Sequence, residues 1–175
     1  ANELKVPFFG PMAGSPTLRR PYQQLVFPVR AEHREEFIAL ISHAKSLGVR
    51  KIAFLRSDSE TGEQHLANVK LICQQLGMEL VADLPFKSDI ADAQLDKMVA
   101  QLAQTDAQMV FNHGGIGIYE KFIRKASAKG VHTAFYAVNS ASAQLVKSLG
   151  DLSHGMVFTQ VMPNPWERKS DITRE

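Results

Sequence analysis

The sequence predicts an α/β fold: a doubly wound parallel sheet of five strands with helices on both faces. Short apolar runs alternate with segments whose apolar residues recur at helical spacing, and the alternation repeats through residues 51–161. Strands that alternate with helices of about 10 to 15 residues pair in parallel through right-handed crossovers. A chain of 175 residues that is 45% hydrophobic also has enough apolar residues to bury a core of ordinary size.

The clearest unit covers residues 51–76. It opens with the apolar run 51–55, and a cluster of turn formers follows: Ser57, Asp58, Ser59 and Gly62. Apolar residues at helical spacing come next: Leu66, Val69, Ile72, Cys73 and Leu76. We expect a strand, a polar loop and a helix. In an open α/β sheet such loops gather at the carboxyl ends of the strands, where ligands bind.

The same pattern predicts the remaining elements of the sheet. Four further strands are expected at residues 79–82, 108–112, 132–136 and 156–161. The helices between them are expected at residues 91–102, 117–128 and 141–149. One more helix is expected at residues 31–47, because acids crowd its first turns, one face is apolar and Gly48 follows its end.

The two ends of the chain do not continue this alternation. Residues 6–9 form a strand-like run before the turn GPMAGSP, and residues 25–29 form a second extended run. Pro28 lacks an N–H, so the second run suits an edge strand or a linker. The segment after Val161 is broken by prolines and then polar.

Charge and composition exclude several classes of protein. The formal net charge is +2, and acids lie beside bases along the chain, so no basic stripe indicates a nucleic-acid partner. The amino-terminal residues lack the pattern of a signal peptide, and no apolar run approaches the ~20 residues of a spanning helix. We expect the chain as given to be soluble. The single cysteine, Cys73, lies on an apolar helix face and is expected to be a buried thiol.

No motif predicts an enzyme, a cofactor or a metal site. The sequence contains no GxSxG elbow for a nucleophilic serine and no HExxH pair for zinc. We expect His33, His43 and His65 to be solvated helix positions. His113 differs, because it stands at a strand end, from which a side chain reaches a ligand; it can equally be loop filler.

The loop NHGGIG at residues 112–117 admits two interpretations. Gly114, Gly115 and Gly117 do not make a GxGxxG fingerprint, so a dinucleotide is not indicated. The glycines allow close approach of a ligand to the backbone and to the N–H groups of the next helix, which favours an anionic group. They are equally compatible with a tight turn and no ligand.

A phosphoacceptor receiver domain has the same alternation but needs different residues. It requires an acidic pair after the first strand, an aspartate that ends the third and a lysine that ends the fifth. Arg56, Ser57 and Asp58 occupy the first of these places, Asn112 and His113 the second, and residues 160–163 the third. The sequence therefore excludes the chemistry of a receiver.

Four patches in order resemble the type I periplasmic solute-binding proteins, in the branch that serves branched-chain amino acid ABC transporters. They are VPFFGPMAGSPTLRRPYQQLVFPVRAEH, GVRKIAFLRSDSETGEQHL, VFNHGGIGIYEKFIRKA and GMVFTQVMPNPW. Such proteins have two lobes joined by three crossing strands and hold the ligand between them. The resemblance implies that residues 1–30 are the end of the first lobe and a hinge crossing, that residues 31–161 are the second α/β ligand-binding lobe, and that residues 162–175 cross back. The first lobe of the same chain would then be missing.

The resemblance also implies where a ligand binds. In the first-lobe loop the matching residues are Met12, Ala13 and Gly14, and Gly14 stands where the family uses a threonine hydroxyl. In the second lobe the implied ligand-binding residues are Ser59, Thr61, His113, Gly114, Gly115, Asn139 and Ser140. Thr61 replaces an aromatic residue that is common in the family. Because the departures remove aromatic or acidic contacts with an amino acid, a small organic acid or amide is as plausible as a leucine-like ligand.

The function implied is that of the substrate-binding component of an ABC transporter. It would capture a small solute for membrane permease subunits and would be periplasmic, exported by a signal peptide outside this sequence. It would not be an enzyme and would need no cofactor. The alternative is a ligand-sensing domain of a receptor or regulator with the same fold, and an export signal without a signalling domain would favour transport.

Overall fold

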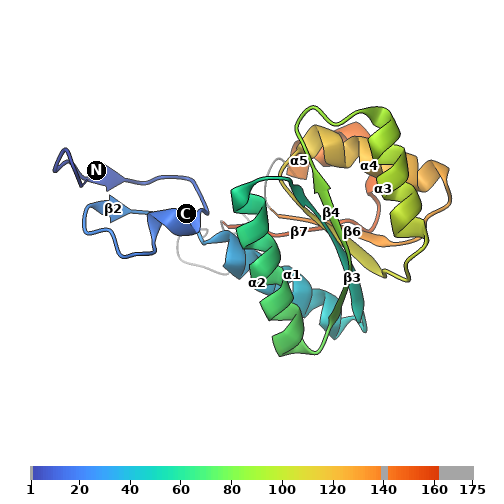
Figure 1. The fold of residues 1–175 in the computed structure, drawn as a ribbon, viewed down its shortest axis with the longest axis horizontal. Coiled ribbons are helices and arrows are strands. Elements are labelled where there is room, and N and C mark those ends of the chain that lie inside the picture. Colours follow the sequence, from blue (N-terminus) through green and yellow to red (C-terminus); the bar gives the residue numbers. More distant parts are fainter. Residues whose placement is uncertain (1, 139–141, 162–175) are drawn as a thin grey trace, which may run out of the picture. The chain divides into compact units, whose positions relative to one another are not determined.

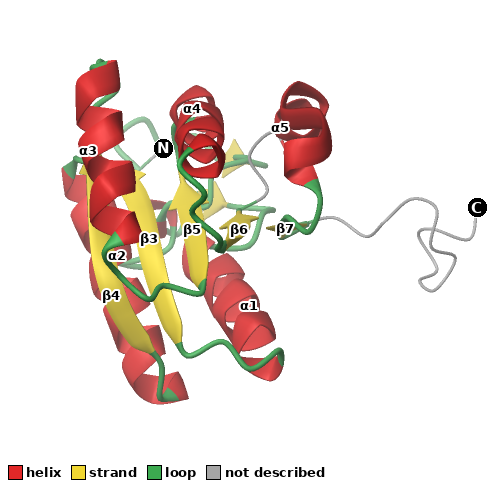
Figure 2. Ribbon diagram, turned by 90° about the vertical axis from the view of Figure 1, so that its right-hand side faces the viewer, coloured by secondary structure: helices red, strands yellow, loops and turns green. Residues whose placement is uncertain are grey.

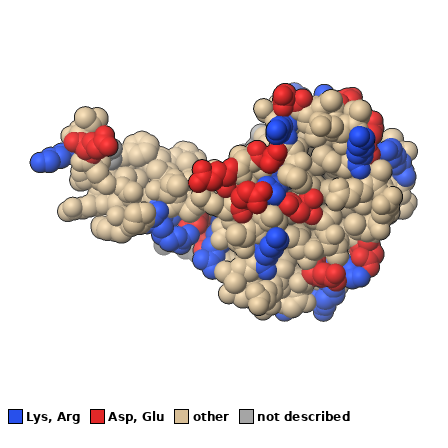
Figure 3. All heavy atoms as spheres, viewed as in Figure 1, with Lys and Arg blue, Asp and Glu red and all other residues tan. Residues whose placement is uncertain are grey.

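The computed structural model describes residues 2–138 and 142–161 (Figure 1). Its chain contacts divide it into two compact units, residues 37–159 and residues 1–36 with 160–175. In the described part of the chain, no helix is long and apolar enough to cross a membrane. Both signs of charge are intermingled on the face of the molecule drawn in Figure 3.

The larger unit is built on a sheet of five parallel strands. The strands lie in the order β4-β3-β5-β6-β7, and Figure 2 shows them side by side. Their bounds are β3 (Lys51–Ser57), β4 (Glu79–Phe86), β5 (Met109–His113), β6 (Ala134–Ala137) and β7 (Val157–Phe158). All four neighbouring pairs are parallel, which confirms the predicted sheet.

Helices cover both faces of this sheet. Their bounds are α1 (His33–Ser46), α2 (Glu60–Leu76), α3 (Asp92–Ala103), α4 (Ile116–Ala128) and α5 (Ser142–Leu149), and the 3-10 helix η2 (Gly150–Ser153) follows. Helices α1 and α2 pack with one apolar cluster, and α3, α4 and α5 pack with another. The doubly wound arrangement predicted from the sequence is confirmed.

Strand β3 shows how one sequence serves both clusters. Ile52 and Phe54 belong to the cluster under α1 and α2, whereas Ala53 and Leu55 belong to the cluster under α3 and α4. Successive side chains of a strand point to opposite faces, so a central strand must be apolar at every position. All four side chains are fully buried.

Several strand ends differ from the prediction. Strand β3 continues through Arg56 and Ser57, which the sequence pattern placed in the loop. Strand β4 continues past its predicted end at Ala82 to Phe86 and includes Pro85. This proline is tolerated because β4 is an edge strand. Strand β7 has only two residues, fewer than the six predicted.

Cys73 is buried in α2, as predicted. Its side chain is 3% exposed and packs in the cluster under α1 and α2. Burial raises the pKa of the thiol to about 11, because the apolar surroundings disfavour the thiolate. At neutral pH this cysteine is a neutral core side chain.

The smaller unit contains a parallel pair of short strands, β1 (Phe8–Phe9) and β2 (Val26–Phe27). Both lie within the extended runs predicted at residues 6–9 and 25–29. The 3-10 helix η1 (Pro16–Leu18) lies between them, capped by the Ser15 hydroxyl. Several large apolar side chains of this unit are exposed: Leu4, Val6, Phe8, Phe9, Met12, Tyr22, Phe27 and Val29.

Candidate functional site

The sheet of the larger unit changes winding direction between β3 and β5. Strand β4 lies on one side of β3, whereas the chain continues from β5 through β6 to β7 on the other side. Helix α2, which leaves β3, packs on one face, and α4, which leaves β5, packs on the opposite face. Open α/β sheets bind ligands at the carboxyl ends of the strands that flank such a switch point, which here are β3 and β5.

Five residues predicted to bind ligand lie at this switch point. Ser59 and Thr61 follow β3, and His113, Gly114 and Gly115 end or follow β5. Arg56 and His113 are partners in the register of the two strands, so both turns begin at the same level of the sheet. The fold thus brings together residues that are more than 50 positions apart in the sequence.

The turn after β3 presents one hydroxyl in a defined state. Ser59 is the N-cap of α2, and its Oγ accepts the Gly62 backbone N–H at 3.1 Å. The same oxygen accepts the Ser57 hydroxyl at 3.1 Å. A hydroxyl has two acceptor positions and one donor. Because both acceptor positions of Ser59 are used, its O–H is the group left to donate to a ligand, and Ser59 and Thr61 are both exposed.

Gly62 is required by close packing in this turn. A Cβ at Gly62 would lie 1.8 Å from the carbonyl oxygen of Ser57. The first turn of α2 therefore sits directly against the end of β3. No larger residue fits without moving one of them.

The turn after β5 is formed by glycines in the left-handed region. Gly114 has φ +90° and Gly115 has φ +56°. Gly115 is the N-cap of α4 and provides no side-chain cap. A Cβ at Gly115 would also lie 2.5 Å from the ring of Phe86, so the turn is both bent and closely packed.

Asn112 begins this turn from a buried position. It is 3% exposed, and its Nδ2 donates to the Gly114 carbonyl at 2.6 Å. Its Oδ1 has no hydrogen-bond partner among the described residues. The side chain therefore tightens the turn from below rather than facing solvent.

His113 lies in an aromatic cluster at the end of β5. Its ring centroid is 4.1 Å from that of His65 in α2 and 5.6 Å from that of Phe37 in α1. His65 is only 1% exposed, so the prediction that it is a solvated helix position is wrong. Helical spacing was the available signal, because His65 lies four residues before Val69 and seven before Ile72, on the apolar face of α2. His43 is exposed, as predicted.

The two imidazoles also change what the sequence suggested about metal ligands. One ring nitrogen of His65 and one of His113 lie within 4.8 Å of each other. Neutral imidazole is a common ligand of transition metals. The absence of an HExxH spacing could not reveal this pair, because the fold, and not the local sequence, brings these histidines together.

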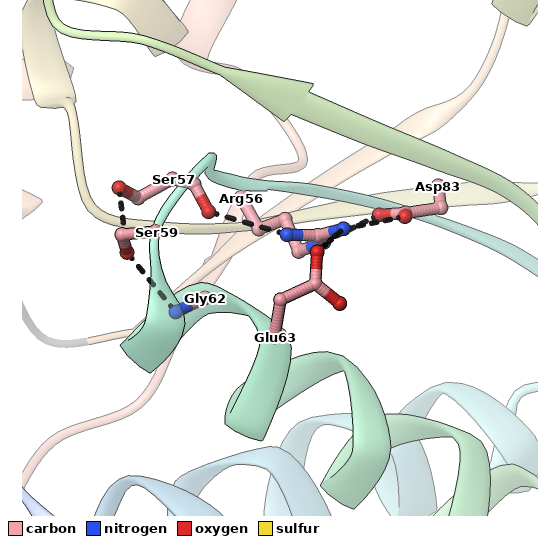
Figure 4. Close-up of polar contacts among 6 residues, drawn as sticks. All are labelled: Arg56, Ser57, Ser59, Gly62, Glu63 and Asp83. Atoms are coloured by element: carbon pink, nitrogen blue, oxygen red, sulfur yellow. Dashed lines mark hydrogen bonds and ion pairs between the residues drawn. The ribbon is translucent and has the colours of Figure 1, made fainter.

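A buried arginine connects the turn after β3 to its neighbours (Figure 4). Arg56 is 3% exposed, and its Nε and Nη2 donate to the two oxygens of Asp83 in β4 at 2.7 and 2.8 Å. Nη2 also donates to Glu63 in α2 at 2.8 Å. The pKa of Arg56 is raised above its ordinary value, chiefly by the hydrogen bond with Asp83, against the opposing effect of burial. Arg56 therefore remains charged.

Sequence reasoning missed this arginine cluster. The sequence pattern places Arg56 in the polar loop after the strand, and Asp83 lies beyond the predicted end of β4. A charged residue that directly follows four apolar strand residues was the available signal, since such a charge must be paired if the strand continues.

The predicted residues of the smaller unit lie in one loop. Met12 and Ala13 are exposed, whereas Gly14 is buried. A Cβ at Gly14 would lie 2.8 Å from the His33 ring, and the Gly14 carbonyl accepts the His33 N–H at 3.0 Å. The space that a threonine would need at this position is occupied by His33. Asn139 and Ser140 lie outside the described residues.

The comparisons identify the family. The family model described as periplasmic binding protein matches residues 1–175. This chain belongs to that family. No curated protein matches the chain at a significant level.

Solved structures of similar fold are solute-binding proteins from several bacteria. An extracellular ligand-binding receptor from Verminephrobacter eiseniae is 26% identical with a TM-score of 0.81, over 99% of this chain and 50% of that one. A substrate-binding periplasmic protein from Ralstonia solanacearum is 23% identical with a TM-score of 0.81, over 99% and 48%. A branched-chain amino acid ABC transporter protein from Thermus thermophilus with bound valine is 18% identical with a TM-score of 0.78, over 89% and 41%. The chain thus spans about half the length of these relatives.

Proposed function

We propose that this chain is the second-lobe part of a substrate-binding component of an ABC transporter. In this proposal residues 31–161 form one side of a cleft, and a first lobe of the same protein forms the other. Residues 1–30 and 162–175 belong to the hinge crossings and to the end of the first lobe. The observation that carries the proposal is the convergence of the two exposed turns after β3 and β5 at the switch point of the sheet.

The ligand in this proposal is a small amino acid or a related organic acid or amide. The exposed Ser59 hydroxyl offers a donor, which suits a carboxylate or carbonyl oxygen of such a solute. His113, Gly114 and Gly115 offer an imidazole and backbone groups from the second turn. Met12, Ala13 and Gly14 would contact the ligand from the first-lobe side, and Thr61, Asn139 and Ser140 would add polar contacts.

The mechanism is binding without chemical change. A solute that contacts both lobes favours the closed form by its differential affinity, and membrane permease subunits would recognise that closed form. The setting would be the periplasm, as for the periplasmic substrate-binding proteins of similar fold. The family and the similar structures are solute-binding proteins, which supports a binding role over catalysis.

Calorimetry on the full-length protein tests the proposal. A panel of amino acids, small organic acids and amides is titrated into protein freed of co-purified solute. We expect saturable heat at a stoichiometry of one for one chemical class, with the ligand recovered unchanged. Recovery of a chemically altered ligand, or absence of binding across the panel, would contradict the proposal.

A variant pair locates the site. Ser59→Ala removes the hydroxyl that is proposed to donate to the ligand. Ser46→Ala removes an exposed hydroxyl that donates to the His43 carbonyl within α1. We expect Ser59→Ala to weaken solute binding and Ser46→Ala to leave it unchanged. Equal affinities would place the ligand elsewhere.

A further inference from the structure

We propose that Arg56 is a positioning residue that holds the turn of residues 57–59 and the first turn of α2 in the geometry that binds solute. The inference rests on the proposed function, because it concerns the same edge of the sheet. Arg56 itself is 3% exposed, too deeply buried to touch a ligand at this edge of the sheet. Its effect must therefore pass through the residues that it contacts.

The guanidinium joins three elements at one point. It lies on β3, pairs with both carboxylate oxygens of Asp83 on β4, and pairs with Glu63 in the first turns of α2. Figure 4 shows the guanidinium between these two carboxylates. A planar guanidinium fixes the directions of its hydrogen bonds, whereas an ammonium group does not. One side chain thus links the first turn of α2 to the edge of the sheet.

The turn between β3 and α2 is held on each of its residues. Nη1 of Arg56 donates to the Ser57 carbonyl at 3.4 Å, and that carbonyl packs against Gly62. The Asp58 N–H donates to the Phe86 carbonyl at 2.7 Å. The Ser59 hydroxyl caps α2. If the guanidinium is lost, the Ser57 carbonyl and Glu63 lose a common anchor, and the Ser59 hydroxyl loses its fixed place.

Stability alone does not account for an ion cluster at this position. These ion pairs are weak evidence for stability, because the Arg56 charge is desolvated by burial while its partners Asp83 and Glu63 are 30% and 61% exposed. A well-packed apolar residue at position 56 would continue the apolar pattern of β3. What Arg56 adds is a defined orientation of the neighbouring turn. A turn that is already held in its bound geometry loses less conformational entropy when a solute binds.

Three variants of the full-length protein test this inference. Arg56→Lys keeps the positive charge and removes the planar guanidinium that donates to both oxygens of Asp83. Glu63→Gln weakens only the link to α2, and because the Glu63 side chain is 61% exposed this variant should fold even if Arg56→Lys does not. Lys125→Met is the matched control, since it removes the ion pairs of Lys125 with Asp92 and Asp96 between α3 and α4, away from the turn.

Two readouts separate positioning from general stability. Hydrogen exchange without ligand reports how firmly the amides of Gly62 and Glu63 are held, because both donate to Ser59. Calorimetry reports the affinity for the solute found in the panel. We expect Arg56→Lys to speed exchange at these amides and weaken solute binding, each about tenfold. Glu63→Gln should change both in the same direction by a smaller factor, and Lys125→Met should change neither.

If the amides of Gly62 and Glu63 exchange as fast in Arg56→Lys and Glu63→Gln as in wild type, the inference is overturned, whatever the ligand. Faster exchange with unchanged solute affinity would also overturn it, because the arginine would then be structural only. If the wild-type protein binds no solute in the panel, the proposed function fails, and the exchange result still decides whether Arg56 holds the turn.

Discussion

The turn after β3 is held by side chains, whereas the turn after β5 is held by its own backbone conformation. In the first, Arg56, Ser57 and Ser59 make hydrogen bonds that link the turn to β4 and α2. In the second, Gly114 and Gly115 adopt positive φ angles. A side-chain hydrogen bond to this turn comes from Asn112, which donates to the Gly114 carbonyl. The first turn presents a hydroxyl in a fixed place, and the second presents backbone groups.

The difference matters for how each turn tolerates change. A turn held by side chains is destabilised when a hydrogen-bond partner is removed or when an added atom clashes at a close contact. A turn held by glycines is destabilised when a Cβ is added, because a positive φ angle is unfavourable for an L-residue with a side chain. Substitutions at glycines of both turns therefore distinguish the two modes.

The largest effect is expected for Gly62→Ala. In a helix, alanine is about 1 kcal/mol more favourable than glycine. Here, however, the added Cβ would lie 1.8 Å from the carbonyl oxygen of Ser57, and relieving this clash requires the backbone to move. We expect a loss of about 3 kcal/mol in the free energy of unfolding, measured by urea denaturation.

Gly117→Ala is the matched control for that change. Gly117 lies in the first turn of α4, and an added Cβ has nothing within 4 Å. We expect it to be neutral or to stabilise the protein by up to about 1 kcal/mol. The same result at both positions would show that the close approach of Gly62 to Ser57 does not govern the turn.

A smaller loss is expected for Gly115→Ala. Positive φ costs about 1 to 2 kcal/mol for alanine, and the Phe86 ring must also move aside. Gly130→Ala shares the positive φ but meets nothing within 4 Å, so it isolates the backbone cost. Denaturation should show Gly115→Ala to be the more costly of the two, at about 2 kcal/mol in total. Equal losses in the two variants would show that contact with the Phe86 ring does not add to the cost of Gly115→Ala.

The pH dependence of stability provides a third test, centred on α2. The pKa of Cys73 is raised to about 11 in the folded protein, above its ordinary value, because burial disfavours the thiolate. This contribution to stability is therefore fully present below the unfolded pKa and is lost as pH rises toward the folded pKa. We expect stability to fall by about 1 kcal/mol more between pH 9 and pH 10 in wild type than in Cys73→Val.

Cys73 also reports whether α2 stays docked when its first turn is loosened. A thiol reagent at pH 8 should react slowly with wild type and with Arg56→Lys alike, because the inferred change is confined to the beginning of the helix. Rapid labelling in Arg56→Lys alone would show that the arginine holds the whole helix.

The smallest effect is expected for Lys125→Met. The pairs of Lys125 with Asp92 and Asp96 join α3 and α4 at the surface, and these two carboxylate side chains are 67% and 44% exposed. Pairs of this kind contribute about 0 to 1 kcal/mol and weaken with salt. Urea denaturation at low and high salt should show a loss within this range that shrinks at high salt, and a larger loss would remove this variant as a control for the turns.

The sheet and its helices could be predicted from local pattern. Apolar runs such as 51–55 and the helical spacing of Leu66, Val69 and Ile72 depend on neighbours along the chain, so the sequence alone revealed them. The carboxyl ends of β3 and β5 were predicted as the binding edge for the same reason, since turn formers follow each run. The strand ends were less predictable, because Arg56, Ser57 and Pro85 join their strands only through pairing with a neighbour.

What the sequence by itself determined is the alternation of elements and the two turns that carry polar residues. Only the tertiary structure decided that Arg56 meets Asp83 and Glu63, that His65 is buried against His113, and that Gly14 has no room for a larger side chain. The physical reason is that helical and strand periodicities are local, whereas the pairing of a buried charge and the packing of a ring depend on residues far away in the sequence. Such contacts exist only once the strands have taken their order.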